Sequence, residues 1–313
     1  MRDMAHDIEE VVLAQGVMTL DDYRVARRVG RGVILNRSKR DAIWPVFEEY
    51  RSQLRSRQLK EVDDAYHDAA QALKAHVAMA YSAIVVDETQ DFGPQALRLL
   101  RAIVSPGKND LFFVGDGHQR IYKRNQTAMS RCGISIQGRS RKLYINYRTT
   151  DEIRRTAVAL LEGIEIDDLD DGADDNRKYK SLSHGPAPIQ ETCTNLEDAQ
   201  KKLFDVLKAW QQDDSNENAT TCVMTVTHNL RTNIATSLKQ QGYAVQILEA
   251  QEPDTATASV IRVSTMHRAK GLEFDHVIVL NDADPDSSEP TDPRLIYVAL
   301  TRAKVRAALL NMA

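Results

Sequence analysis

Two adjacent carboxylates, Asp87 and Glu88, directly follow an apolar, mostly β-branched run at residues 82–86. An apolar strand that ends in acids places them at the edge where α/β sheets bind ligands. In a nucleotide hydrolase the first acid would hold Mg²⁺, directly or through water, and the second would orient and polarise the attacking water. A solvated turn after a strand would show the same two residues, so this pair alone leaves both interpretations open.

A second apolar run, at residues 111–114, also ends in a polar loop. The loop contains Gly115 and Gly117, which let the backbone approach a ligand closely. Gln119 can both donate and accept a hydrogen bond, and Tyr122 offers a ring face for stacking. Taken alone, such a segment is more often an ordinary loop than a ligand site.

The elements that must position these side chains follow from the hydrophobic pattern. Up to about residue 80, apolar residues recur at three- and four-residue steps, which predicts helices. From residue 82 onward, continuous apolar runs alternate with helical segments, a pattern typical of parallel strands covered on both faces. We expect later strands near 189–192, 222–226, 245, 260–263 and 277–280, helices at 196–210, 229–240 and 293–304, and a final apolar run at 305–310.

Composition bounds the class of protein. The 313 residues are enough for two domains of roughly 100–200 residues each. With 42% hydrophobic and 27% charged residues, the chain is not wholly disordered, collagen-like or coiled-coil. The formal net charge is -4, so binding to nucleic acid must rest on a local basic cluster. Such a cluster follows the second apolar run and consists of Arg120, Lys123, Arg124, Arg131, Arg139, Arg141 and Lys142.

The three cysteines and the amino-terminal residues indicate the compartment. The cysteines are odd in number and show no CxxC spacing, which supports neither a disulfide framework nor a cysteine zinc site. The first ten residues carry acids where a signal peptide needs an apolar stretch, and no segment approaches the ~20 apolar residues of a membrane span. We therefore expect a soluble cytoplasmic protein with no membrane partner.

Five segments together carry a family resemblance. In chain order they are Asp-Glu-Thr-Gln at 87–90, Gly-Asp-Gly-His-Gln-Arg-Ile-Tyr at 115–122, Asn-Tyr-Arg-Thr-Thr at 146–150, Ser-Thr-Met-His-Arg-Ala-Lys-Gly-Leu-Glu-Phe at 264–274 and Tyr-Val-Ala-Leu-Thr-Arg-Ala-Lys at 297–304. They resemble motifs II to VI of the UvrD/Rep-like superfamily 1 DNA helicases. Five motifs in family order, from about residue 82 to the end, are far more specific than any one of them.

The resemblance implies an α/β fold with two RecA-like, P-loop NTPase-type parallel-sheet domains that sandwich ATP while single-stranded DNA crosses both. It implies that Asp87 serves Mg²⁺, that Glu88 activates water, and that Gln119 senses the γ-phosphate. In the motifs whose loops touch DNA, the corresponding residues are Arg120, Tyr122, His267 and Arg268.

For the second domain, the resemblance implies that Tyr147 stacks on adenine and that Arg148 and Arg302 reach the γ-phosphate. Glu273 resembles the acid that contacts ribose, and Gly271 of the same motif is assigned to nucleotide binding. Chemistry supports the arginine roles, because a planar guanidinium stabilises charge on transferring phosphoryl oxygens and arginine fingers are worth ~10³ to 10⁵ in rate in other NTPases.

Each of these residues also has a purely structural interpretation. Arg302 could be a surface arginine on the last helix, and Arg148 could pair with Asp151 three residues later. Glu273 could be the polar end of a buried strand, and His267 a hydrogen-bonded structural histidine.

One family motif is missing. A P-loop reads G-x-x-x-x-G-K-[ST], and the 313 residues contain no such segment. In the family the P-loop strand lies beside the motif III strand, so we expect an unpaired apolar edge near residues 111–114. We expect the chain to be either the carboxyl-terminal portion of a longer helicase-like polypeptide or a truncated member that relies on another chain for this strand.

The expected domains follow from the motif positions. Residues 1–80 form a helical segment that resembles the accessory insertion before motif II. Residues 81–141 form part of a first RecA-like motor domain, and residues 142–313 form a second one with a reduced insertion.

The leading hypothesis is a UvrD/Rep-like ATP-dependent DNA helicase or translocase. It would couple Mg²⁺-dependent ATP hydrolysis to movement on single-stranded DNA, with 3′-to-5′ polarity, but would hydrolyse ATP poorly as this chain alone. The alternative is a non-catalytic DNA- or protein-binding module derived from a helicase and completed by a partner chain.

Overall fold

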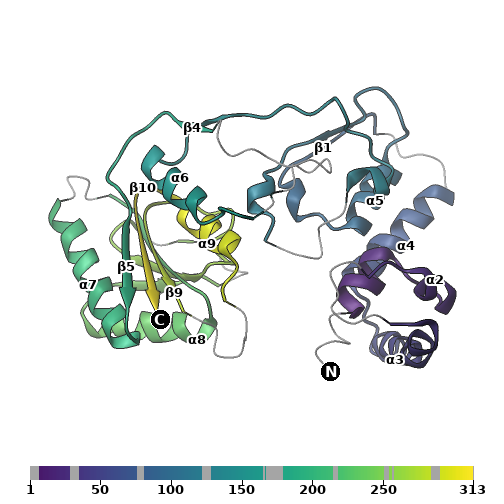
Figure 1. Cartoon of the computed structure of the whole chain (residues 1–313), viewed down its shortest axis with the longest axis horizontal. Coiled ribbons are helices and arrows are strands. Elements are labelled where there is room, and N and C mark those ends of the chain that lie inside the picture. Colours follow the sequence, from purple (N-terminus) through teal and green to yellow (C-terminus); the bar gives the residue numbers. More distant parts are fainter. Residues whose placement is uncertain are drawn as a thin grey trace. The chain divides into compact units, whose positions relative to one another are not determined.

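A computed structural model describes residues 7–28, 35–75, 81–121, 128–164, 166, 179–213, 218–249, 254–255, 257–282 and 290–312. The chain divides into two compact units with a boundary between Ser140 and Arg141, which we call the amino-terminal unit and the carboxyl-terminal unit. Figure 1 labels the main helices and strands of both units. Within the described residues, no helix combines the length and the apolar character that crossing a bilayer requires.

The amino-terminal unit begins with helices, as the periodicity before residue 80 predicts. They are the π-helix η1 (Ile8–Leu13) and the α-helices α2 (Leu20–Val25), α3 (Arg37–Ser56) and α4 (Val62–Ala75). Tyr23, Trp44 and Phe47 pack with ring centroids 5.1–6.0 Å apart and form the core of these helices. Thr19 caps α2 in a reciprocal arrangement with Asp22, which fixes where that helix begins.

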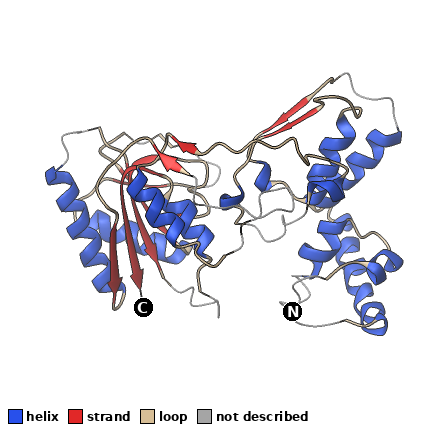
Figure 2. Cartoon of the chain, turned by 45° about the horizontal axis from the view of Figure 1, so that its top comes forward, coloured by secondary structure: helices blue, strands red, loops and turns tan. Residues whose placement is uncertain are grey.

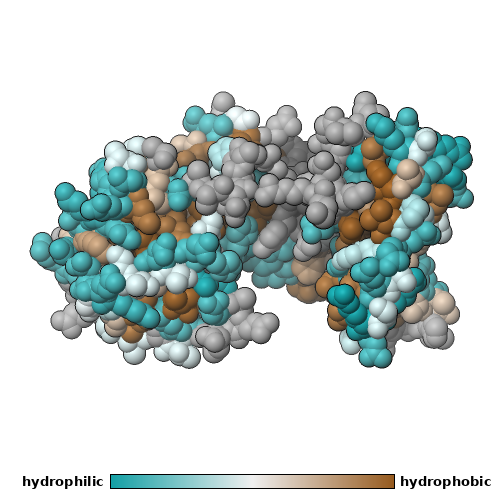
Figure 3. Space-filling view, turned by 90° about the horizontal axis from the view of Figure 1, so that it is seen from below, coloured by the Kyte–Doolittle hydropathy of each residue, from teal (hydrophilic) through white to brown (hydrophobic). Residues whose placement is uncertain are grey.

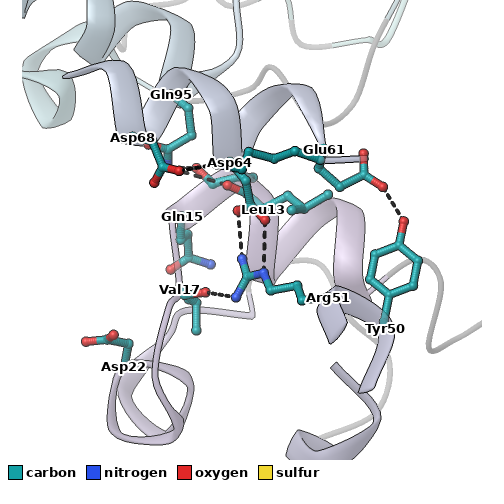
Figure 4. A network of polar contacts seen from close by, with 12 residues as sticks. Leu13, Gln15, Val17, Asp22, Tyr50, Arg51, Glu61, Asp64, Asp68 and Gln95 are labelled. Atoms are coloured by element: carbon teal, nitrogen blue, oxygen red, sulfur yellow. Dashed lines mark hydrogen bonds and ion pairs between the residues drawn. The ribbon is translucent and has the colours of Figure 1, made fainter. Parts of the chain in front are cut away.

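Polar contacts connect α3 to α4 (Figure 4). Arg51 of α3 donates two hydrogen bonds to the Asp64 carboxylate of α4, at 2.7 and 2.9 Å, and a third to the Val17 carbonyl at 2.8 Å. Tyr50 donates to Glu61 beside them. Because both Arg51 and Asp64 are largely buried, each satisfies the charge of the other.

The rest of this unit contains a two-stranded parallel sheet of β1 (Ile84–Val86) and β2 (Leu111–Phe113). The short 3₁₀-helix η2 (Thr89–Asp91) and α5 (Pro94–Ile103) connect the strands. One face of the sheet, through Leu111 and Phe113, packs on a core cluster that includes Leu97 of α5. The described residues that follow include the 3₁₀-helices η3 (Gly117–Gln119) and η5 (Met129–Cys132).

The other face of this small sheet is exposed at the two residues that lie at its centre. Val85 and Phe112 are register partners on that face, and they are 74% and 62% exposed. Among the described residues, β2 pairs with β1 alone, as the sequence predicts for the apolar edge at 111–114. Figure 3 shows that hydrophobic residues reach the surface on both units.

The carboxyl-terminal unit contains a six-stranded parallel sheet with the strand order β5-β10-β9-β6-β8-β7 (Figure 2). The strands are β5 (Ile189–Cys193), β6 (Thr221–Thr225), β7 (Val245–Ile247), β8 (Ile261–Thr265), β9 (Phe274–Asn281) and β10 (Ala303–Met312). A separate parallel pair is formed by β3 (Ile145–Asn146) and β4 (Lys180–Ser181). The helices are α6 (Asp151–Ala159), α7 (Leu196–Asp213), α8 (His228–Gln240) and α9 (Pro293–Leu300).

Both faces of the large sheet are buried. Ile278 and Leu280 of β9 belong to a core cluster with α7 and α8. Val277 and Val279 alternate with them, so they point to the opposite face, and they are also fully buried. This is the arrangement that continuous apolar runs predict, and the α/β fold class with parallel sheets is confirmed.

One predicted element is wrong at its end. The last helix was expected over 293–304, but α9 ends at Leu300 and β10 begins at Ala303. The Thr301 hydroxyl donates back to the carbonyls of Tyr297 and Val298, which closes the helix. Ala303 then pairs with Phe274 of β9, so sheet pairing takes over where helical periodicity alone would continue.

Candidate functional site

The two acids at the end of β1 lie in an unusual backbone turn. β1 ends at Val86, and Glu88 adopts left-handed angles, φ 51° and ψ 40°. A residue with a side chain rarely adopts this region, and such outliers cluster at functional sites. The backbone N–H and the hydroxyl of Thr89 both donate to the Val114 carbonyl, at 2.9 and 2.7 Å, which holds the turn against the end of β2.

The loop after β2 is organised by the Asp116 carboxylate. It accepts hydrogen bonds from the His118 backbone at 3.0 Å and from the Gln119 side chain at 2.9 Å, and His118 Nδ1 lies 3.0 Å away. Burial acts to raise the pKa of Asp116, but the hydrogen bonds from His118 and Gln119 hold it below its ordinary value. The loop therefore keeps a charged carboxylate and presents Gln119 from a fixed position.

One residue that sequence reasoning did not single out joins these two loops. Gln90, in η2, donates from its side chain to Glu88 Oε2 and accepts from the Asp116 backbone N–H at 2.9 Å. Its position two residues after Glu88 was the available signal, but nothing in the sequence marks it as buried.

In the carboxyl-terminal unit, a side chain of β3 shapes the turn that carries two predicted site residues. Asn146 Oδ1 accepts from the backbone N–H groups of Arg148 and Thr149, at 2.7 and 3.3 Å. Its amide donates to the Thr149 hydroxyl at 2.8 Å. The turn leaves the Tyr147 ring exposed, where a flat ligand could stack on it.

Arg148, Glu273 and Lys304 form one cluster, although they come from three separate motifs. Arg148 Nε lies 2.6 Å from Glu273 Oε1, and Lys304 Nζ lies 3.2 Å from Glu273 Oε2. Burial acts to raise the pKa of Glu273, but the neighbouring cations Arg148, Lys304 and Arg302 hold it below its ordinary value. The cluster therefore carries more positive than negative charge, which suits it to a phosphate. Lys304 was not among the predicted site residues.

The structural alternative for Arg148 is wrong. Asp151 pairs with Arg154 and Arg155, both at 2.7 Å, and Arg148 pairs with Glu273. Glu273 directly precedes the buried strand β9, as its structural alternative states, but it also joins the charged cluster.

Arg302 does not lie on the surface of a helix. It occupies the turn between α9 and β10, it is 1% exposed, and its Nε donates to the Val298 carbonyl at 3.1 Å. The surface interpretation is therefore wrong, and Arg302 is a buried cation close enough to Glu273 to lower the pKa of that acid.

The motif after β8 brings two histidines near each other. Burial, together with His228 and Lys270, lowers the pKa of His267. His228 begins α8 directly after β6, the strand that pairs with β8, so sheet order explains a neighbour that the sequence did not reveal. Arg268 Nε donates to the Glu249 carbonyl at 2.8 Å, and Gly271 has φ +82°, a backbone angle that favours glycine.

The remaining predicted residues differ in accessibility. Arg120 is buried, so its side chain does not present a charge at the surface in this structure. Tyr122 lies outside the described residues. Asp87 is exposed beside Glu88. Within the described part of the chain there is no group of three or more metal-ligating side chains, but Mg²⁺ at nucleotide sites is commonly held by one or two carboxylates plus substrate phosphates, which Asp87 fits.

Two models of known protein families match this chain, each over a region that carries some of these motifs. The model of the UvrD/REP helicase N-terminal domain matches residues 29–130, which include Asp87, Glu88 and Gln119. The model of the UvrD-like helicase C-terminal domain matches residues 260–310, which include Glu273 and Arg302. In both regions the chain matches the UvrD-like helicases.

Other comparisons are less informative for this UvrD-like chain. No curated protein gives a significant match. A solved structure described as the C-terminal domain of a possible DNA helicase from Lactobacillus plantarum WCFS1 is similar, with 22% sequence identity and a TM-score of 0.40. That match covers 53% of this chain and 88% of the other. Tyr147 and Arg148 lie outside both family matches, so their assignment rests on the motif at 146–150 and on the cluster with Glu273.

Proposed function

We propose that this UvrD-like chain takes part in ATP-dependent movement of a helicase or translocase on single-stranded DNA, with 3′-to-5′ polarity. The observation that carries the proposal is the cluster of Arg148, Glu273 and Lys304, in which residues of motifs IV, V and VI meet around one carboxylate. The three motifs are separate in the sequence but meet at one charged group, which favours a common ligand over three separate structural roles.

The amino-terminal unit would supply the hydrolytic carboxylates. Asp87 would hold Mg²⁺, whose chemistry is to neutralise phosphate charge. Glu88 would accept a hydrogen bond from the attacking water and polarise it, and Gln119 would contact the γ-phosphate. The left-handed turn at Glu88 supports this proposal, because strain of this kind is typical of active sites.

The carboxyl-terminal unit would supply the nucleotide contacts and the cations. Tyr147 would stack on adenine, and Glu273 with the Gly271 turn would lie at the ribose. Arg148 would exchange Glu273 for the γ-phosphate, and Arg302, which is buried, would contribute a fixed positive charge to the same phosphate. Lys304 keeps Glu273 paired when Arg148 leaves.

For DNA, the loops that carry Arg120, Tyr122, His267 and Arg268 would contact the strand, with a salt-dependent affinity. A cytoplasmic location fits this role. The domains would be a helical segment over 1–80, part of a first motor domain over 81–141 and a second motor domain over 142–313.

The missing P-loop limits what this chain does alone. Without glycine amides, lysine and hydroxyl ligands for the phosphates, ATP would bind weakly and hydrolyse slowly. We propose that these groups come from a longer polypeptide or from a partner chain.

Phosphate release in the presence of Mg²⁺ and single-stranded DNA tests the proposal. The chain should show slow, DNA-stimulated hydrolysis, and Glu88→Gln should lower the rate by at least about tenfold because the amide cannot polarise water as a carboxylate does. Equal residual rates for the two proteins would refute hydrolysis by this chain.

The second candidate is a non-catalytic module that binds DNA or a partner protein, and the absent P-loop favours it. In that case the chain would bind labelled single-stranded DNA, with affinity that falls as salt rises, yet release no phosphate. Binding of DNA together with hydrolysis that depends on Glu88 would exclude it.

A further inference from the structure

Gln90 is fully buried, and both polar atoms of its side-chain amide are hydrogen-bonded. Nε2 donates to Glu88 Oε2, and Oε1 accepts from the Asp116 backbone N–H at 2.9 Å. A buried polar group is costly unless it is satisfied, so this amide has one favourable orientation only. Reversing it would set a donor against a donor and an acceptor against a carboxylate.

On one side Gln90 bonds to Glu88, whose side chain would otherwise move. Glu88 is exposed, and its backbone lies in the left-handed region. An exposed glutamate ordinarily samples several rotamers, but the bond from a buried amide to its charged Oε2 restricts them. Gln90 thus holds one carboxylate oxygen while the residue stays accessible to solvent.

On its other side, Gln90 bonds to Asp116 in the loop that follows β2. The Asp116 carboxylate accepts a hydrogen bond from the Gln119 side-chain amide at Oδ2, 2.9 Å away. It accepts another from the His118 backbone N–H at Oδ1, 3.0 Å away. Hydrogen bonds therefore run from Glu88 through Gln90 and the residue Asp116 to Gln119 without leaving the amino-terminal unit.

We propose that Gln90 is a positioning residue, which holds the Glu88 carboxylate and the Gln119 amide in a fixed relation. The inference rests on the proposed function, because it assigns catalytic work to Glu88. Gln90 touches neither water nor nucleotide in this role, and it acts through the two residues that do.

Two substitutions at Gln90 test its hydrogen bonds to Glu88 and to Asp116. Gln90→Glu keeps an oxygen that can accept from the Asp116 N–H but replaces the donor to Glu88 with a second oxygen. Gln90→Leu removes both bonds. Gln95→Leu is the matched control, because Gln95 is also fully buried but donates to the Ala14 carbonyl, at 3.1 Å, away from both loops.

The first measurement is amide hydrogen exchange over residues 114–119, which needs no nucleotide. Gln90→Leu should speed exchange at the Asp116 amide by at least about tenfold, because its acceptor is gone. Gln90→Glu should change this amide less, and Gln95→Leu should leave it as in the wild type. An unchanged exchange rate of the Asp116 amide in Gln90→Leu would refute the inference that Gln90 holds this loop.

The second measurement is the split between kcat and KM in DNA-stimulated ATP hydrolysis. Both Gln90 variants should lower kcat by about tenfold or more with KM for ATP within about twofold, because positioning acts on the reaction step. Gln95→Leu should retain wild-type kcat. A wild-type kcat in Gln90→Leu would overturn the positioning role.

The two failures are distinguishable. If wild type and Glu88→Gln hydrolyse ATP equally, the proposed function fails and with it the catalytic role of Gln90, while hydrogen exchange still decides whether Gln90 holds the loop. If wild type hydrolyses ATP and the Gln90 variants match it, the inference alone fails. Gln95→Leu, which also replaces a buried amide with leucine, shows how much of any loss of activity in Gln90→Leu comes from a weakened fold.

Discussion

The two units hold their candidate site residues by different forces. In the amino-terminal unit, a buried neutral amide, Gln90, fixes the Glu88 carboxylate. In the carboxyl-terminal unit, Arg148 and Lys304 are held by ion pairs with Glu273, and the three side chains are 42%, 44% and 33% exposed. A buried hydrogen bond keeps its partner in place, whereas a half-exposed ion pair lets a partner leave at little cost.

This difference matches the proposed tasks. A carboxylate that polarises water gains from a fixed position throughout the reaction. An arginine that detects a phosphate must move when the phosphate arrives, and an exposed pair worth ~0–1 kcal/mol allows that movement. Arg302 provides a contrast beside this cluster, because it is buried and hydrogen-bonded to the Val298 carbonyl.

The largest expected effect therefore separates the two arginines. Arg302→Ala should lower the free energy of unfolding by about 3 kcal/mol, since it removes a buried, hydrogen-bonded side chain. Arg148→Ala should cost less than about 1 kcal/mol, because its ion pair is half exposed. Urea unfolding of both variants measures the difference, and equal losses would break the distinction between fixed and exchangeable cations.

The exposed ring of Tyr147 should affect binding and not stability. Tyr147→Ala should weaken binding of a fluorescent ATP analogue about tenfold, since base stacking contributes ~1–3 kcal/mol, and should leave the unfolding midpoint nearly unchanged. Tyr144→Ala is the control, because the Tyr144 ring packs 5.3 Å from that of Tyr179. Tyr144→Ala should lower stability while nucleotide affinity stays the same; the opposite pattern would refute the assignment of Tyr147.

Salt should distinguish the two kinds of contact. The stability lost in Glu273→Gln should be below about 1 kcal/mol at low salt and should disappear near ~1 M salt, where the Debye length is ~3 Å. The stability lost in Gln90→Leu should persist at both salt concentrations, because it removes neutral and charge-assisted hydrogen bonds at a buried amide. A salt-insensitive Glu273→Gln effect, measured by the same unfolding assay, would contradict the comparison.

The smallest effect is on pH dependence. The pKa of Glu273 is lowered in the folded protein from an ordinary value of 4.5. Its ion pairs therefore stabilise the fold above that ordinary value, and their contribution is lost as the pH falls through the lowered folded-state pKa. The stability difference between wild type and Glu273→Gln should be constant near neutral pH and vanish in acid. A stability difference between the two proteins that grows as the pH falls would contradict this prediction.

The sequence predicted well what depends on local pattern. The acids at 87 and 88 lie at the end of β1, and the apolar runs form parallel strands, because strand character and its carboxyl end are set by neighbouring residues. The end of α9 was wrong because pairing of Ala303 with β9, a tertiary contact, decides it.

The contacts of the site could not be predicted in the same way. Arg148 has a suitable acid three residues away, yet Arg154 and Arg155 occupy Asp151, and sheet pairing brings Glu273 and Lys304 together. Gln90 is polar, so no hydrophobic pattern indicates that it is buried between two loops. Such contacts depend on the three-dimensional arrangement of distant segments.

The most direct test of a fixed carboxylate and an exchangeable arginine is one NMR titration with Mg²⁺ and a non-hydrolysable ATP analogue. It follows the Nε–H signal of Arg148 and the side-chain amide signals of Gln90 in the same sample. The Arg148 signal should shift as nucleotide is added, while the Gln90 signals should keep their positions and their protection from exchange. An Arg148 signal that does not move, or Gln90 signals that move with it, would refute the distinction between a fixed carboxylate and an exchangeable arginine.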